Sequence, residues 1–80
     1  MLMFHGLDSI EFSHNGIKIM SDNTPWRFNF SKILWVRYDP KTMTLSIECR
    51  GAMADHRFQA TIPATDLPKS SEVVMVNWNS

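Results

Sequence analysis

Apolar and polar residues alternate along several short stretches of this chain, which is the pattern of β-strands with one buried and one exposed face. The alternation runs without a break through residues 43–50 and returns in residues 56–62. The positions that it predicts on the buried face are Met43, Leu45, Ile47, Cys49, His56, Phe58, Ala60 and Ile62. This period of two indicates an antiparallel sheet that covers a core with one face.

Asn15 and Gly16 separate two further apolar stretches. Asn-Gly is the preferred pair for a two-residue type I′ turn, because both central residues of that turn have positive φ. A turn at this pair places Phe12 opposite Ile19. The apolar residues of both arms then share one face, namely Ile10, Phe12, Ile17 and Ile19. We therefore predict a tight hairpin over residues 10–21.

Residues 39–42, Asp-Pro-Lys-Thr, suit a type I turn with Pro40 at its second position. A loop of these four residues predicts a second hairpin, in which three inward-facing pairs form: Tyr38 with Met43, Val36 with Leu45, and Leu34 with Ile47. The intervening residues of the first arm must then face outward, and these are Ile33, Trp35 and Arg37. The same outer face carries Glu48, Arg50 and Arg57.

Residues 24–35 fit two patterns. Trp26, Phe28 and Phe30 alternate as in a strand, whereas Trp26, Phe30, Ile33 and Leu34 also form a helical stripe. Aromatic and β-branched residues favour the strand. A bulge or bend near Ser31 would explain why Lys32 interrupts the apolar face of that strand.

The end of the chain carries one more apolar stretch. Residues 63–72 contain two prolines and several turn-forming residues, which indicates a surface crossing. Residues 73–78 are apolar on both faces until Asn77, which predicts a final strand that is buried by the sheet or by another chain. In sum, we expect a single domain over residues 1–80 that is all-β and mainly antiparallel. Its six to seven short strands would form a small meander barrel or sandwich, with either a strand or one short helix within residues 24–35.

Composition narrows the functional classes. The 80 residues contain eight Lys and Arg against eight Asp and Glu, and a balanced charge disfavours proteins that bind nucleic-acid backbones. Cys49 is the only cysteine, so that an intrachain disulfide is excluded. The chain has no apolar run of about 20 residues, which is the length of a membrane span, and we expect no membrane partner. A lone thiol and the absence of a signal peptide favour the cytoplasm.

Cys49, His56 and Asp55 are the residues from which a nucleophilic site could be built. The chain has neither a nucleophile elbow nor a glycine-rich phosphate loop. The soft metal ligands are His5, His14, His56 and Cys49, and none of them forms a paired spacing of the C-x2-C type. We therefore expect no enzyme activity, no cofactor and no metal.

The outer face of the second hairpin is the first candidate for a functional surface. Trp and Arg are enriched at binding hot spots, and the residues concerned are Ile33, Trp35, Arg37, Glu48 and Arg57. The other interpretation of Trp35 is a core residue under a curled sheet. The second candidate is the final strand with Val74, Val76 and Trp78, which could pair with another copy to form a homodimer.

These features favour a small cytoplasmic protein that binds another protein as a regulator, inhibitor or adaptor, of the kind that phages and mobile elements encode. The alternative function is single-stranded nucleic-acid binding by a small β-barrel. Stacking aromatics beside a basic track are typical of such sites, and Trp35, Arg37, Arg50, Arg57 and Lys32 could supply both. Glu48 in the same patch and the neutral chain make this the second choice.

Overall fold

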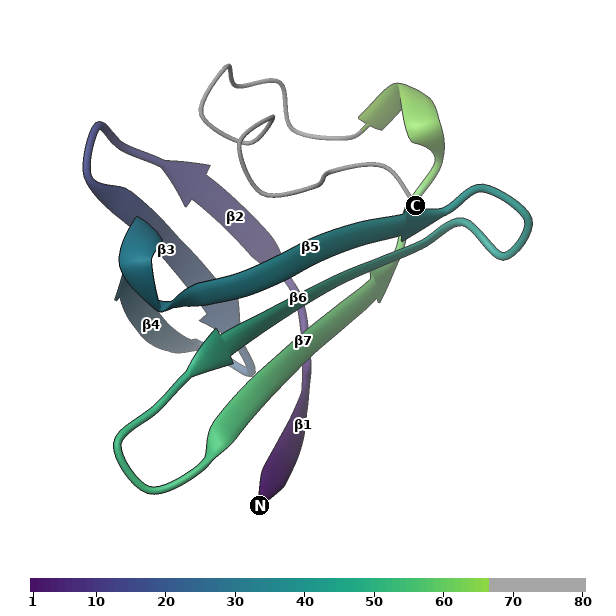
Figure 1. Cartoon of the computed structure of the whole chain (residues 1–80). Coiled ribbons are helices and arrows are strands. Elements are labelled where there is room, and N and C mark those ends of the chain that lie inside the picture. The colour runs from purple at the N-terminus through teal and green to yellow at the C-terminus, as the bar shows by residue number, and fades with distance from the viewer. Residues whose placement is uncertain (67–80) are drawn as a thin grey trace.

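A computed structural model describes residues 1–66 of the chain, which form two small β-sheets (Figure 1). The larger sheet has the strand order β1-β7-β6-β5 and the smaller has the order β2-β3-β4. The strands are β1 (Leu2–Gly6), β2 (Ser9–Phe12), β3 (Gly16–Ser21), β4 (Thr24–Asn29), β5 (Ile33–Asp39), β6 (Thr44–Arg50) and β7 (Asp55–Thr61). Two single-turn 3-10 helices, η1 (Phe30–Lys32) and η2 (Ala64–Asp66), complete the described part. The predicted final strand over residues 73–78 lies outside it.

The fold class is all-β and mainly antiparallel, as the alternation predicts. One pairing departs from a meander, because β1 runs parallel to β7. Two residues then carry the chain from the larger sheet to the smaller one. The Leu7 amide donates to the carbonyl of Gln59 at 2.9 Å, and the Asp8 amide donates to the carbonyl of Met20 at 2.8 Å. These bonds link the two sheets at the point where the chain passes between them.

The first hairpin forms with a different turn from the one predicted. Phe12 pairs with Ile17, so that four residues, 13–16, separate the paired positions. Within residues 1–66, positive φ occurs at Asp22, Asn23 and Met43, and at no glycine. The two-residue turn with positive φ at both central positions therefore joins β3 to β4 at Asp22 and Asn23. The apolar face is as predicted, because a register shift of two residues leaves every side chain on its original face.

The second hairpin is shifted by two residues in the same way. Tyr38 pairs with Leu45 and Val36 pairs with Ile47, so that the predicted pairing of Tyr38 with Met43 is wrong. Met43 belongs to the loop, where it has a φ of 56° and is 45% exposed. The left-handed conformation at this residue closes the turn and removes its side chain from the core.

An irregularity in β5 corrects a further prediction. Ile33 pairs with Cys49 and Trp35 pairs with Glu48, so that β5 has one extra residue between these pairs. The extra residue reverses the alternation, as a β-bulge does. Ile33 is consequently buried and Leu34 is exposed, which is the opposite of the predicted arrangement. The segment before the bulge is a strand, β4, and the predicted bend near Ser31 is the short helix η1.

The core lies between the two sheets. Its buried apolar residues are Leu7, Ile17, Ile19, Ile33, Val36, Tyr38, Leu45, Ile47, Cys49 and Phe58. Trp26 and Phe28 of the smaller sheet pack against this cluster. The polar tip of Tyr38 is satisfied, because its hydroxyl donates to the carbonyl of Ile62 at 2.9 Å. The larger sheet thus turns one face to the core and presents the other, its outer face, away from it.

Candidate binding surface

Four residues form a continuous row across the outer face of the larger sheet. Phe4 on β1 pairs with Arg57 on β7, Arg57 pairs with Glu48 on β6, and Glu48 pairs with Trp35 on β5. Direct partners on neighbouring strands point to the same face and lie within contact distance. We call Phe4, Arg57, Glu48 and Trp35 the outer row.

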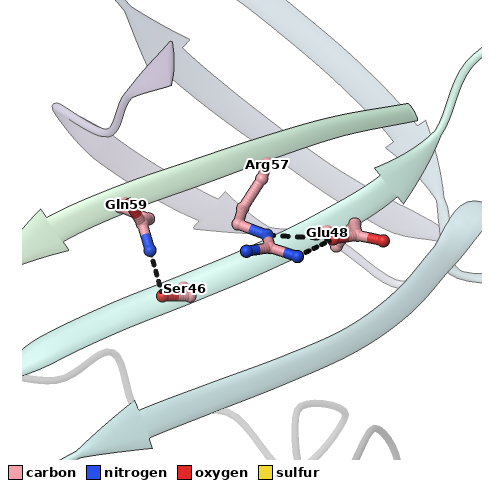
Figure 2. A network of polar contacts seen from close by, with 4 residues as sticks. All are labelled: Ser46, Glu48, Arg57 and Gln59. Atoms are coloured by element: carbon pink, nitrogen blue, oxygen red, sulfur yellow. Dashed lines mark hydrogen bonds and ion pairs between the residues drawn. The ribbon is translucent and has the colours of Figure 1, made fainter. Parts of the chain in front are cut away.

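Arg57 connects the members of the outer row. Its Nε and Nη2 atoms donate to the same carboxylate oxygen of Glu48, at 2.9 and 2.7 Å (Figure 2). Its guanidinium lies 5.4 Å from the centre of the Phe4 ring and 5.0 Å from that of Trp35. A cation at such distances over an aromatic ring contributes about 0.5–1 kcal/mol at an exposed site. One ion pair and two rings therefore hold this guanidinium in place.

A second, polar row runs beside the first. Arg37 pairs with Ser46, and Ser46 pairs with Gln59, whose side-chain amide donates to the Ser46 hydroxyl at 3.1 Å (Figure 2). The guanidinium of Arg37 lies 4.3 Å from the centre of the Trp35 ring. Trp35 therefore contacts two guanidinium groups and is half-buried by them on the outer face. The prediction that Trp35 lies outside the core is correct.

A shallow depression of about 300 Å³ opens where these two rows meet the β5–β6 hairpin. It is lined by Trp35, Arg37, Asp39, Thr42, Thr44, Ser46, Arg57 and Gln59. An aromatic surface, two guanidiniums, one carboxylate and several neutral hydrogen-bonding groups thus converge there. Such a mixture suits a polypeptide surface better than it suits a small apolar ligand.

The structure brings together four of the residues that the sequence predicted for this surface, namely Trp35, Arg37, Glu48 and Arg57. Ile33 does not belong to it, because the bulge turns this residue into the core. The second predicted set, Val74, Val76 and Trp78, lies outside the described residues. Two further basic residues belong to the nucleic-acid alternative: Arg50 pairs with Asp55 one row further along, and Lys32 lies in η1 before β5.

Phe4 is the member of the outer row that sequence reasoning missed. Phe4 is 64% exposed, although it lies in a strand of the sheet that covers the core. The first six residues show no clean alternation, so the pattern did not identify β1. Only the parallel pairing with β7 places Phe4 next to Arg57.

Cys49 and His56 both face inward, as the alternation predicted, and the structure makes them direct partners on neighbouring strands. Cys49 is fully buried, and burial, followed by the nearby charge of Glu48, raises the pKa of its thiol to about 12. A thiol that stays protonated at neutral pH is a poor nucleophile and a poor metal ligand. Within residues 1–66, no group of three or more potential metal-ligating side chains comes together.

Comparisons with known proteins give no further assignment. Across residues 1–66, no helix has the length and apolar character needed to cross a membrane. No protein-family model matches the chain, and neither a curated protein nor a solved structure matches it.

Proposed function

We propose that this chain is a non-enzymatic binding protein that docks onto a protein partner through the outer face of its larger sheet, as a regulator, inhibitor or adaptor. The outer row is the observation that carries this proposal. It presents two aromatic rings on either side of an arginine that is already fixed by Glu48. Aromatic residues and arginine are the side chains that most often dominate the free energy of protein–protein binding.

The arrangement of the outer row lowers the entropic cost of binding. Immobilising a long side chain at an interface costs about 0.5–1.5 kcal/mol. Arg57 has lost much of that freedom before any partner arrives, since the Glu48 carboxylate and the two rings restrain it. The ring of Phe4 is a large apolar surface that the fold of residues 1–66 leaves exposed. A partner that covers this ring would remove apolar area from water.

Charge favours a protein partner over a nucleic acid. The positive charge of Arg57 is paired with Glu48, and Asp39 lines the same depression as Arg37. A phosphate backbone would have to compete with both carboxylates. The buried, protonated thiol of Cys49 supports the non-enzymatic part of the proposal.

The cellular setting is also part of the proposal. We infer a cytoplasmic location from the lone cysteine. One thiol cannot form an intrachain disulfide, and such disulfides are typical of proteins in oxidising compartments. We retain the homodimer through residues 73–78 as a second proposed interaction. Sedimentation of the full chain and of a Val76→Asp variant would test it, with a shift to the monomer expected for the variant.

Photo-crosslinking at Phe4 tests the binding surface directly. A photoreactive phenylalanine analogue at position 4, at the exposed end of the outer row, would capture a partner from an extract of the source cells. The same analogue at Arg27, which is exposed on the smaller sheet, is the matched control. The captured protein is then purified, and its Kd is measured with the wild type, Trp35→Ala and Arg27→Ala.

We expect Trp35→Ala to weaken that Kd by about tenfold or more, as truncation of a hot-spot residue does, and Arg27→Ala to leave it unchanged. Equal Kd values for the wild type and Trp35→Ala would refute the proposed surface. Binding of a single-stranded oligonucleotide that weakens steeply with salt and requires Arg37 would instead establish the nucleic-acid alternative.

A further inference from the structure

Two histidines lie directly behind the outer row, on the inner face of the same sheet. His5 follows Phe4 on β1, and His56 precedes Arg57 on β7. Since successive side chains of a strand point to opposite faces, each histidine faces inward where its neighbour faces outward. The Nε2 atom of His5 lies 3.0 Å from the Nδ1 atom of His56, which is a hydrogen bond between the two rings.

Aromatic residues of both sheets pack against this histidine pair. The ring centre of Trp26 on β4 lies 5.0 Å from that of His5 and 4.7 Å from that of His56. Phe58 stacks on His5 at 4.9 Å. Beyond His56, a Cβ added at Gly51 would lie 2.8 Å from its Nε2 atom, so the loop after β6 closes that side.

Few charged groups face the pair. Asp22, in the turn between β3 and β4, is the carboxylate that acts on His5. The thiol of Cys49, the β6 partner of His56, is protonated at neutral pH. The remaining packed neighbours are the uncharged rings of Trp26 and Phe58. Asp22 is therefore the carboxylate that offsets the charge of a protonated His5, while the charge of His56 opposes it.

The histidine pair matters for the attachment of β1. This strand is at the edge of the larger sheet, where β7 is its one partner within residues 1–66. The bond from His5 is the one side-chain hydrogen bond that β1 makes in the same part of the chain. The packing of His5 against Trp26 also connects β1 to the smaller sheet. Loss of the pair would leave β1 with its backbone ladder and the contact of Phe4 with Arg57.

Protonation changes what the two rings can do for each other. A neutral imidazole has one N–H donor and one acceptor nitrogen, whereas an imidazolium has two donors and no acceptor. A pair with one extra proton keeps this single hydrogen bond, which becomes charge-assisted. A pair with two extra protons has two donors facing each other at 3.0 Å, with like charges.

We propose that the His5–His56 pair is a pH-sensitive contact that holds β1, and with it Phe4, on the larger sheet near neutral pH and releases both when the pair takes up its second proton. The release would change the surface that we propose for partner binding. The biological meaning of this inference therefore rests on the proposed function. A partner that binds the outer row would then dissociate on acidification, because Phe4 leaves its place beside Arg57.

The direction of the effect follows from His5. Burial lowers the pKa of His5 below its ordinary value of 6.5, the charge of His56 lowers it further, and Asp22 acts in the opposite sense. When β1 is detached, His5 regains its ordinary pKa and binds a proton more readily. The attached state is therefore fully favoured above about pH 6.5 and loses stability as the pH falls from there toward the lowered pKa.

Amide hydrogen exchange of the full chain tests this inference without any partner. Protection factors, which already correct for the intrinsic pH dependence of exchange, are compared at about pH 7.5 and about pH 5. We expect the protection of the β1 amides to fall by about tenfold or more, while β3 keeps its protection. The variant His5→Gln, which retains a hydrogen-bonding side chain but does not titrate, should lose this pH dependence. His14→Gln, at an exposed turn position, is the matched control and should keep it.

Three results would overturn the inference. The first is equal β1 protection in the wild type at both pH values. The second is the same loss in His5→Gln as in the wild type. The third is a parallel loss in β1 and β3, which would indicate acid unfolding of the whole domain. If His5→Gln does not fold, His5→Phe keeps the ring stacking and serves the same purpose. The crosslinking result at Phe4 is independent of all three, so failure of one proposal is distinguishable from failure of the other.

Discussion

Single residues determine how closely the strands of the smaller sheet approach each other. Gly16 opens β3 opposite Asn29, and a Cβ at this position would collide with the carbonyl oxygen of Phe28. The value of this glycine is therefore its lack of a side chain, since its φ is not positive. Positive φ is instead found at Asp22 and Asn23 in the next turn. Asp and Asn are residue types that tolerate the left-handed region.

Gly16→Ala should lower the free energy of unfolding by about 1–3 kcal/mol. The new methyl group would clash with backbone atoms of β4, and a change of side-chain rotamer cannot relieve such a clash. Urea unfolding monitored by tryptophan fluorescence would measure the loss. Gly6→Ala is the matched control, since a Cβ at Gly6 has nothing within 4 Å, and its stability should equal that of the wild type. Equal stability of both variants would contradict the close approach of β3 and β4.

At the scale of elements, the outer row depends on four strands at once. Each strand contributes one residue, and the neighbouring residue on the same strand faces the core. Phe58 next to Arg57 is fully buried, as is Ile47 next to Glu48. The inner face of the larger sheet thus contributes to the core, and the outer face carries the candidate binding residues. Substitutions on the two faces should therefore affect stability and binding separately.

Two truncations on opposite faces of the sheet test this separation. Trp35→Ala should cost less than about 1.5 kcal/mol of unfolding free energy, because it removes a half-buried ring and its contacts with Arg37 and Arg57. Phe58→Ala should cost about 3–5 kcal/mol, as core aromatic truncations do. Chemical denaturation of both variants measures the difference. A loss of several kcal/mol for Trp35→Ala would place its ring in the core and remove the proposed surface.

At the scale of the whole molecule, two sheets of four and three strands close on one shared core. The connection through Leu7 and Asp8 joins them, and Cys49 is fully buried in this core, to which both sheets contribute residues. Reagents therefore reach this thiol only when the sheets separate.

Alkylation of Cys49 should consequently report global unfolding. We expect iodoacetamide to react with the native protein at about pH 8 at least 100-fold more slowly than with the chain in denaturant. The raised thiol pKa adds a stability effect at high pH. The unfolded thiol loses its proton from about pH 9.0, while the folded one keeps it until about 12, so stability falls as the pH rises between these values. Native labelling as fast as in denaturant would contradict a closed core.

Local pattern explains which predictions succeeded. Leu45, Ile47, Cys49 and Phe58 were identified as inward-facing, because the pleat of a strand makes alternate side chains share a face whatever the partner strand is. Both hairpins were displaced by two residues, yet the faces of Ile17, Ile19, Val36 and Tyr38 were correct for the same reason. The apolar pattern repeats every two residues and is indifferent to such a shift.

The all-β class and the two faces of most strands could be predicted from the residues alone, because burial imposes a local alternation on any half-covered sheet. Three features could not be predicted and are known from the fold: the parallel pairing of β1 with β7, the bulge that turns Ile33 inward, and the contacts of Phe4 with Arg57 and of His5 with His56. The contacts of β1 join residues that lie about fifty positions apart. Their formation depends on which strand edges meet when the core closes, and the local alternation of residues does not determine which strands pair.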